Sequence, residues 1–305
     1  MTPSRWAAVV VNYEAGPLLI ECVQSLLADT TAGVPEVVVV DNGSTDGSID
    51  ALRLAVPDVA VLVPGSNMGY AGAANQNIGY AGAANLGTAA TSAPIVAVCN
   101  CDIRIRSGTA AAALARFDAE PDLAALGPAV RDPDGTRYPS ARTVPNLRDT
   151  VGHAMLGLAR PANRFTRRYR ELDADPIRAR DVDWVSGAAI WLRRSAVDAV
   201  GGWDDGYFMY VEDVDLCWRL RNAGWRIVYE PAGEVTHVQG ASTARRPVRM
   251  VLEHHRSLLR FASKRWRGWR RVLLVPAAGF LALRAGVTAG AVAVRPRRRL
   301  PRATR

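Results

Sequence analysis

Residues 212–215, Glu-Asp-Val-Asp, are the stretch of this 305-residue sequence whose residue types are best suited to chemistry. The surrounding pattern predicts a helix that begins with this run and stops at Gly224, so three carboxylates fall in the first turn. Unpaired N–H groups and the helix dipole favour negative charge there, and an acidic cap on a surface helix would look the same. Aromatic and apolar residues directly before the run favour a partly enclosed site. Arg219 lies one turn after Asp215 and can pair with it, which would leave Asp213 free as a general base.

Two further residues could bind a divalent metal. Asp102 follows the apolar run Val96–Asn100, so its carboxylate can face a ligand crevice at the end of a strand, and Mg²⁺ or Mn²⁺ prefers oxygen ligands. An Asp that caps the next turn would occupy the same position. His237 could be a second ligand, although a lone His is more often structural. One base and one metal site suffice for sugar transfer from a nucleotide diphosphate, because a metal-bound diphosphate leaves without a second carboxylic acid.

A polar loop, Asp41–Gly47, follows another apolar run, Glu36–Val40. The loop has the wrong spacing for a Walker phosphate loop and lacks the Lys of that motif. Its turn-forming residues predict a rigid loop that could hydrogen-bond a base or a ribose.

Short apolar runs and helical patterns alternate along the chain and would position these residues. Strands are predicted at Trp6–Val11, Glu36–Val40, Val59–Val63, Ile95–Val98, Leu123–Leu126 and Gly187–Arg193, and helices at Pro17–Leu27, Ala81–Ala90 and Gly108–Phe117. This alternation predicts an α/β fold with a mostly parallel, Rossmann-like sheet flanked by helices, which binds ligands at the carboxyl ends of its strands. The polar clusters at Asn12, Asp41 and Asp102 each follow a predicted strand.

A tandem repeat interrupts this alternation, because residues 67–76 (NMGYAGAANQ) are nearly copied by residues 77–86 (NIGYAGAANL). Two copies of this length cannot stack into a solenoid, so the repeat is interpreted as a duplication within a loop and helix start. The second copy runs directly into the helix before Ile95. We expect it to occupy the functional register while the first copy lengthens the loop.

The formal charge of +9 is concentrated at one end of the chain. Lys264–Arg305 contains 12 Lys and Arg and no acidic residue, which leaves 26 basic and 29 acidic residues, a net charge of −3, in the rest. This tail encloses the apolar run Val272–Val294, and the combination favours anionic lipid over nucleic acid. Pro276, Arg284 and four Gly or Thr residues weaken a membrane-spanning helix, so an interfacial or re-entrant segment is expected.

The cysteines and the first residues bear on the compartment. The four cysteines are too scattered for a disulfide framework, and Cys99-x-Cys101 lacks the spacing of usual zinc or redox pairs, which favours reduced thiols in a cytosolic protein. Met1 to Val11 resembles a first strand and not a secretory signal, so the catalytic part is expected on the cytoplasmic side.

As an ordered set, several motifs resemble those of glycosyltransferase family 2 and, within it, a bacterial rhamnosyltransferase-like branch. The motifs are Val-Asn-Tyr13, Val-Val-Asp-Asn-Gly-Ser-Thr-Asp46, Asn-x-Gly-Tyr-Ala-Gly with a following Asn, Asn-Cys-Asp102, Gly-Ala-Ala189, Tyr-Val-Glu-Asp-Val-Asp215 and His237-x-x-Gly-x-Ser242. The resemblance spans Trp6 to Ser242. It implies a GT-A fold, here as a nucleotide-sugar transferase domain over residues 1–245, followed by a basic, helical, membrane-associating segment over residues 246–305.

The resemblance also implies a nucleotide-sugar donor site in the first third of the chain. Its expected residues are Asn12, Tyr13, Asp41, Asn42, Asn77, Gly79 and Asn85. Asp41 would hold the nucleobase or the ribose, and the last three residues, from the second repeat copy, would line the donor pocket.

The resemblance gives the chemistry to residues later in the chain. Asp102 and His237 would hold Mg²⁺ or Mn²⁺ against the diphosphate. Asp213 would be the general base, with Glu212 and Asp215 orienting the acceptor or supporting the helix.

Two features depart from the family pattern. Relatives commonly have Asn-Pro-Asp or an Asp-x-Asp pair where this chain has Asn100-Cys101-Asp102, so a second carboxylate ligand is absent and His237 carries more weight. The duplicated loop is the other departure, since an extra copy that displaces the donor loop would reduce or abolish activity.

The resemblance implies an inverting enzyme that moves L-rhamnose from dTDP-L-rhamnose to N-acetylglucosaminyl diphosphoryl polyprenol at the cytoplasmic face of the cell membrane. Three alternatives stay open: another donor such as UDP-galactofuranose or UDP-N-acetylglucosamine, a catalytically dead nucleotide-sugar binding scaffold, and a nucleic-acid protein. The last is disfavoured because the basic tail has no recognition fold and the rest of the chain is acidic. The sequence leaves a homo-oligomer open.

Overall fold

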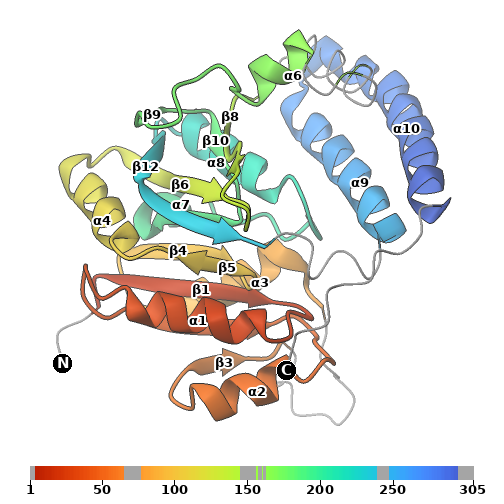
Figure 1. Cartoon of the computed structure of the whole chain (residues 1–305). Helices are drawn as coiled ribbons and strands as arrows, with labels where there is room; N and C mark the ends of the chain where they lie inside the picture. The colour runs from red at the N-terminus through yellow and green to blue at the C-terminus, as the bar shows by residue number, and fades with distance from the viewer. Residues whose placement is uncertain are drawn as a thin grey trace. The chain divides into compact units, whose positions relative to one another are not determined.

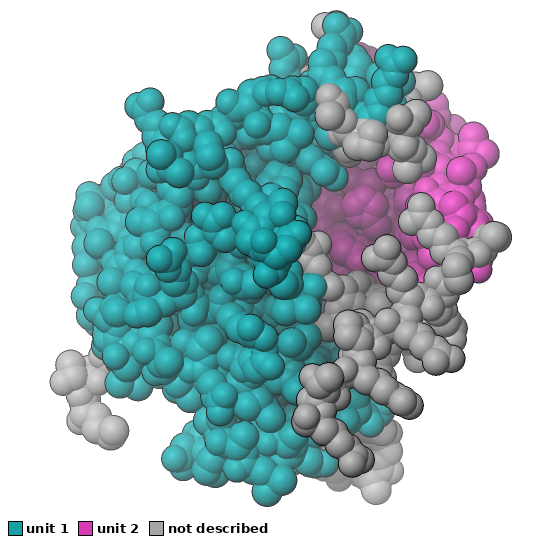
Figure 2. All heavy atoms as spheres, viewed as in Figure 1, with its two compact units in different colours: residues 1–208, 212–242 teal, residues 209–211, 243–305 magenta. Residues whose placement is uncertain are grey.

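The computed structural model describes residues 4–64, 77–144, 156, 160, 163–238 and 247–294. The chain forms two compact units, Met1–Phe208 with Glu212–Ser242 and Met209–Val211 with Thr243–Arg305 (Figure 2). The division into domains 1–245 and 246–305 stays a prediction about independent folding. The first repeat copy, residues 67–76, lies outside the described residues.

The first unit is built on a twisted sheet that starts with four parallel strands (Figure 1). In spatial order these are β3 (Ala60–Leu62), β2 (Glu36–Asp41), β1 (Trp6–Asn12) and β4 (Ile95–Asn100). Their connecting helices are α1 (Leu18–Ala28), α2 (Ser48–Ala55) and α3 (Gly79–Ala89). The register sets Asn12 beside Asp41, so the carboxyl ends of β1 and β2 present their polar residues together.

The second half of the sheet is mixed. Strand β11 (Ala189–Arg193) lies antiparallel between β4 and β6 (Leu123–Arg131), and β12 (Arg226–His237) is parallel to β6 and antiparallel to β5 (Ile103–Ile105). The predicted α/β architecture is confirmed, with these antiparallel strands as an addition. The other elements of this unit are α4 (Thr109–Ala119), β7 (Arg137–Tyr138), β8 (Ala141–Arg142), α6 (Arg164–Tyr169), β9 (Arg180–Asp181), β10 (Trp184–Val185), α7 (Arg194–Ala199) and α8 (Glu212–Asn222).

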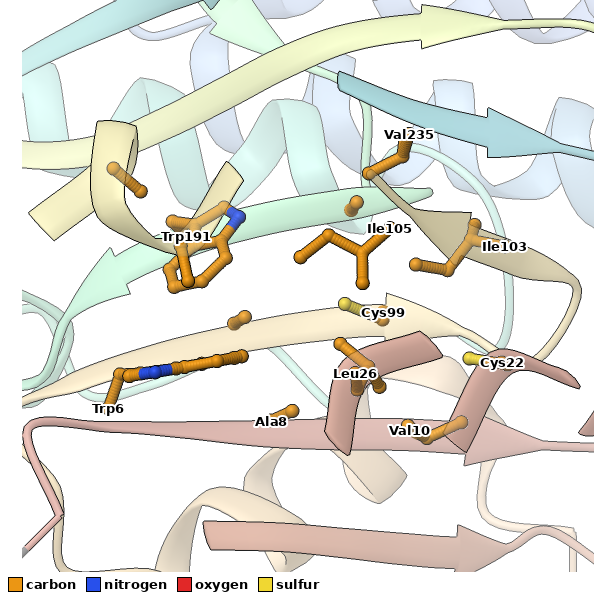
Figure 3. Close-up of a cluster of buried hydrophobic side chains, with 14 of the residues drawn as sticks. Trp6, Ala8, Val10, Cys22, Leu26, Cys99, Ile103, Ile105, Trp191 and Val235 are labelled. Atoms are coloured by element: carbon orange, nitrogen blue, oxygen red, sulfur yellow. The ribbon is translucent and has the colours of Figure 1, made fainter. Parts of the chain in front are cut away.

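The two faces of the sheet are covered by different helices, as alternation along β1 requires. Ala8 and Val10 face α1 and join a buried cluster with Cys99 and Trp191 (Figure 3). Val9 faces α3, where Gly87 lies so close that a Cβ there would come within 2.3 Å of the Val9 side chain. Close packing on both faces fixes the strand ends that carry the polar residues.

The second unit is a helical pair. It contains α9 (Pro247–Arg265), a 3₁₀ turn η2 (Gly268–Leu273) and α10 (Leu274–Val294). Gly268–Ala293 is long and apolar enough to cross a membrane, and only 6% of its most apolar window is buried. Pro276 lies in the first turn of α10, where a missing N–H costs little, and the expectation of an interfacial or re-entrant segment stays a prediction.

Candidate active site

The ends of β1 and β2 form a hydrogen-bonded platform. Asn12 is fully buried, and its amide donates to Asp41 Oδ1 at 2.9 Å, Ser44 Oγ at 3.0 Å and Ser48 Oγ at 3.2 Å. Asp41 is 3% exposed and also accepts from the Ser44 N–H. Asn12 thus orients the carboxylate and the loop that follows it. The Asn12 amide nitrogen is engaged within the protein, and the predicted donor-binding roles of Asp41 and Asn12 stay predictions.

Two neighbours complete the platform. Tyr13, predicted to lie near the donor, is partly exposed. Glu14, which no sequence motif singled out, is 6% exposed with φ of 55° and accepts from the N–H and hydroxyl of Thr45 at 2.7 and 2.9 Å. Few residues other than Gly adopt this left-handed backbone conformation. The Glu14 side chain connects the end of β1 to the polar loop.

The second repeat copy is fastened to this platform. Asn42 accepts from the Ile78 N–H at 2.8 Å and donates to the Gly79 carbonyl at 3.1 Å, while Asn77 Oδ1 accepts from the Gly79 N–H. Gly79 has φ of 78°, and a Cβ there would come within 2.6 Å of the Phe208 carbonyl oxygen, so the position requires Gly. The prediction that the second copy leads into the helix is confirmed, because it supplies the start of α3.

Asn85 holds a different segment. Its side-chain oxygen accepts from the Trp203 N–H at 2.9 Å and its nitrogen donates to the Trp203 carbonyl at 2.9 Å. Both polar atoms of Asn85 are therefore engaged by main chain. Asn85 thus joins α3 to the segment at Trp203, and a direct contact with the donor stays a prediction.

Asp102 and His237 meet, although 134 residues separate them in the sequence. Antiparallel pairing of β12 with β5 sets His237 opposite Ile103, and His237 Nε2 lies 3.0 Å from Asp102 Oδ1 and 3.2 Å from Asn100 Nδ2. Asp102 is 5% exposed. His237 Nδ1 is buried and has no hydrogen-bond partner among the described residues. Cys101 belongs to the buried core instead, so the departure from the family motif leaves the polar pair intact.

This pair fits a divalent cation as a partial ligand set. A carboxylate and an imidazole are suitable ligands for Mn²⁺, and His237 Nδ1 has no hydrogen-bond partner among the described residues that would compete with a ligand role. Among the described residues no three His, Cys, Asp or Glu side chains are arranged so that they could hold a metal ion together, so the remaining ligands would come from substrate and water.

Asp215 supports helix α8. Its side chain is fully buried and is bonded by Arg219 Nε at 2.7 Å and by the Tyr207 hydroxyl at 3.2 Å, and Arg219 also donates to the Val200 carbonyl at 2.7 Å. The predicted pairing of Asp215 with Arg219 is confirmed. Because the carboxylate is enclosed and already bonded, the geometry favours the second of its two predicted roles, which is support of the helix.

Asp213 is the partly exposed carboxylate of the acidic run. Its Oδ2 accepts from the Gly187 N–H at 2.9 Å and its Oδ1 from the Val214 N–H at 2.8 Å. Gly187 in turn accepts from the Tyr80 hydroxyl at 2.7 Å, which joins the second repeat copy to the acidic run. Burial raises the pKa of Asp213, while the two N–H groups and the charge of Arg142 oppose that rise.

Glu212 is 7% exposed, and its Oε2 is buried without a hydrogen-bond partner among the described residues. Burial raises its pKa well above the ordinary value, and the neighbouring charge of Asp213 raises it further. Tyr210 and Val211, directly before Glu212, have φ of 68° and 71°. A β-branched residue in this region is strained, and strain of this kind concentrates at functional sites.

Arg142 also belongs to this site, and no motif indicated it. Its guanidinium lies 4.9 Å from the ring centre of Trp184, 5.4 Å from Tyr138 and 5.7 Å from Tyr169. Its positive charge lowers the pKa of Asp213, and β8, which carries Arg142, pairs with β10 shortly before Gly187. In the sequence Arg142 is one Arg among many, so only tertiary structure distinguishes it.

Parallel strands that carry polar residues at their carboxyl ends, with an acidic helix start nearby, are typical of α/β proteins that bind nucleotide-linked ligands at that edge of the sheet. The family described as "Glycosyltransferase like family 2" matches residues 3–254. A similar protein is the N-acetylglucosaminyl-diphospho-decaprenol L-rhamnosyltransferase of Mycobacterium tuberculosis (strain ATCC 25618 / H37Rv), which is 41% identical over 298 residues, 95% of each chain. The chain belongs to glycosyltransferase family 2 and is a glycosyltransferase.

Solved structures support the fold. Mannosyltransferase PcManGT from Pyrobaculum calidifontis, in complex with GDP-Man and Mn²⁺, has a TM-score of 0.55 at 20% identity and covers 96% of this chain and 74% of its own. GalNAc-T7 with UDP, GalNAc and Mn²⁺ has a TM-score of 0.52 at 14% identity and covers 76% of this chain and 42% of its own. The expected GT-A fold is confirmed, and both of these related folds were solved with Mn²⁺.

Proposed function

We propose that this glycosyltransferase moves L-rhamnose from dTDP-L-rhamnose to N-acetylglucosamine diphosphate carried on a polyprenol, with inversion at the sugar. The observation that carries the substrate assignment is the 41% identity to the mycobacterial decaprenol-linked rhamnosyltransferase along almost the whole of both chains. The site supports it, because the second repeat copy is integrated into the fold and Asp213 is held in place by main-chain donors.

The acidic run would supply the base. Asp213 accepts the proton of the acceptor hydroxyl, the hydroxyl oxygen bonds to the anomeric carbon, and the bond from that carbon to the nucleoside diphosphate breaks. A single displacement of this kind inverts the anomeric centre. Glu212, buried beside the base, would orient the acceptor, and Asp215 would keep α8 in place through Arg219.

The donor and the metal would lie at the carboxyl ends of β1, β2 and β4. Asp41 would bind the base or ribose on the platform that Asn12 and Asn42 hold, with Tyr13 beside it. Asp102 and His237 would hold Mg²⁺ or Mn²⁺. When bound, the cation neutralises the diphosphate that leaves.

A reconstituted assay tests the function. Purified protein with dTDP-rhamnose, Mn²⁺ and a short polyprenyl diphosphate N-acetylglucosamine acceptor is expected to give one product, a rhamnosyl-N-acetylglucosamine lipid, by mass spectrometry. Parallel reactions with UDP-galactofuranose and UDP-N-acetylglucosamine serve as donor controls. Turnover with a UDP-sugar only would refute the rhamnose assignment, and no turnover with intact donor binding would favour a catalytically inactive scaffold.

The second unit would bring the enzyme to its lipid acceptor at the cytoplasmic face of the membrane. Trp269, Val272 and Val275 are 72%, 69% and 78% exposed, and Arg270 and Arg271 beside them are exposed as well. Aromatic and aliphatic side chains next to Arg match the boundary of an anionic bilayer. These exposures support an interfacial anchor at η2 and the start of α10.

Vesicle flotation tests the anchor. Replacing Arg267, Arg270 and Arg271 together by Gln is expected to weaken binding to phosphatidylglycerol vesicles by roughly a hundredfold, because each cation near an anionic surface contributes about 1 kcal/mol. Arg53→Gln, on exposed α2, is the matched control and should bind like the unaltered protein. Binding that survives both the triple replacement and alkaline carbonate extraction would show a spanning helix and refute the interfacial anchor.

A further inference from the structure

Arg142 is held more rigidly than a surface arginine. Besides its three aromatic neighbours, its Nη2 donates to the Tyr138 hydroxyl at 2.7 Å and its Nε donates to the Pro139 carbonyl at 2.9 Å. Stacking and hydrogen bonds fix the position of the planar guanidinium. Its charge is fixed as well, because Arg stays protonated at every accessible pH. Its positive charge is therefore a permanent feature of the site.

A short ribbon connects Arg142 to the acidic run. Strand β8 pairs with β10 so that Arg142 lies opposite Trp184, and the pairing continues where the Ser186 N–H donates to the Ser140 carbonyl at 2.8 Å. The next residue, Gly187, donates its N–H to Asp213. One structural unit therefore carries both the cation and the main-chain donor that act on this carboxylate.

We propose that Arg142 is a positioning residue for the base, and that its fixed positive charge keeps Asp213 ionised in a site whose burial favours the protonated form. The proposal rests on the proposed function, in which Asp213 accepts the proton of the acceptor. Arg142 acts on the carboxylate and need not contact the substrate.

The other ionisable groups around Asp213 do not supply this charge. Burial raises the pKa of Tyr80, on α3, and raises that of Cys217, on α8, to about 12, so both are neutral near pH 7. Glu212 adds only negative charge when it ionises. On α8, Arg219 pairs with Asp215 and Arg221 with Asp183 at 2.6 Å. Among the described residues, Arg142 is a cation whose charge lowers the pKa of Asp213 and for which the structure shows no ion pair with a carboxylate of its own.

The pH dependence of kcat/KM tests the proposal. The pKa of Asp213 is already raised by burial, and removing the opposing charge raises it further, so a smaller fraction of the base is ionised at a given pH. In Arg142→Gln the acidic limb of the profile should move to higher pH by about one unit. At a given pH on that limb, kcat/KM should therefore fall about tenfold. Activity should recover towards the plateau at high pH. In Arg142→Lys, which keeps the charge, the limb should move much less.

Two controls separate this effect from simple damage. Arg180 also stacks on an aromatic ring, Tyr229 at 4.7 Å, and Arg180→Gln should leave the limb in place. Calorimetric titration with dTDP should show that each variant still binds nucleotide and is folded. A uniform loss at every pH in Arg142→Gln, with an unmoved limb, would overturn the proposal and leave Arg142 a purely structural residue.

Asp213→Asn distinguishes this inference from the proposed function. If Asp213→Asn is inactive and the limb in Arg142→Gln does not move, the role of Arg142 is refuted and the base assignment stands. If Asp213→Asn keeps its turnover, the base assignment itself fails.

Discussion

Replacing Asp213 by Asn is expected to lower turnover by roughly a thousandfold while donor binding persists. The amide keeps the size of the side chain but cannot take up the proton of the acceptor, and general bases typically contribute two to four orders of magnitude. The Gly187 and Val214 N–H groups both donate to this carboxylate, and one of them would face the new NH₂ group. A modest loss of stability, about 1 kcal/mol, is therefore expected as well. Single-turnover rates at saturating donor measure the chemical effect.

Asp215→Asn is the matched control, from the same helical turn. That change weakens the ion pair that neutralises the partly buried Arg219. The midpoint of thermal unfolding should therefore fall, by an amount that corresponds to a loss of about 3 kcal/mol in the free energy of unfolding. The expected contrast is an inactive Asp213 variant that loses little stability and an Asp215 variant that loses more stability but retains some activity while folded. Equal loss of stability in both, with turnover retained in Asp213→Asn, would remove Asp213 as the base.

Removal of divalent metal is expected to have the second largest effect. Chelation should reduce turnover to background and added Mn²⁺ should restore it, because a divalent cation neutralises the diphosphate as it leaves. Asp102→Asn should weaken Mn²⁺ binding by ten- to a hundredfold, since an amide oxygen is a poorer ligand than a carboxylate. The EPR signal of free Mn²⁺, titrated with protein and dTDP, measures this affinity without any reaction.

Asp50→Asn, on the exposed helix α2, is the control for a general loss of negative charge and should bind Mn²⁺ unchanged. Full activity in excess chelator would contradict the metal assignment. His237→Gln should show the same weakening as Asp102→Asn, because His237 Nε2 lies 3.0 Å from the Asp102 carboxylate.

Local patterns predicted the fold well where the chain alternates between strand and helix. The predicted strand at Ile95–Val98 became β4 (Ile95–Asn100), and the helix predicted to begin with the acidic run became α8. These elements are set by hydrophobic periodicity, which is read along the chain. The antiparallel insertion of β11 between β4 and β6 depends on contacts between distant segments, and periodicity carries no information about them.

The candidate site likewise contains residues that the sequence indicated and residues that only the tertiary structure distinguishes. Asp102 and His237 were paired by family resemblance, and their contact depends on β5 and β12 pairing across more than a hundred residues. The three acids of residues 212–215 are equivalent in a sequence pattern. Burial separates them, because Asp215 is enclosed and bonded to Arg219 while Asp213 keeps an exposed edge. Arg142 had no local signal, since its role depends on aromatic rings contributed by three different segments.

Glu212 sets a limit on how this enzyme can be stabilised. It is a carboxyl that burial disfavours in its charged form, placed after two residues with positive φ and beside a second acid. A neutral, well-packed side chain there would remove the buried charge and its repulsion by Asp213, so redesign for stability would select this position early. Under the proposed role of Glu212, selection for thermal tolerance and selection for catalysis oppose each other at this position, and a more stable enzyme has to be obtained by changes elsewhere in the chain.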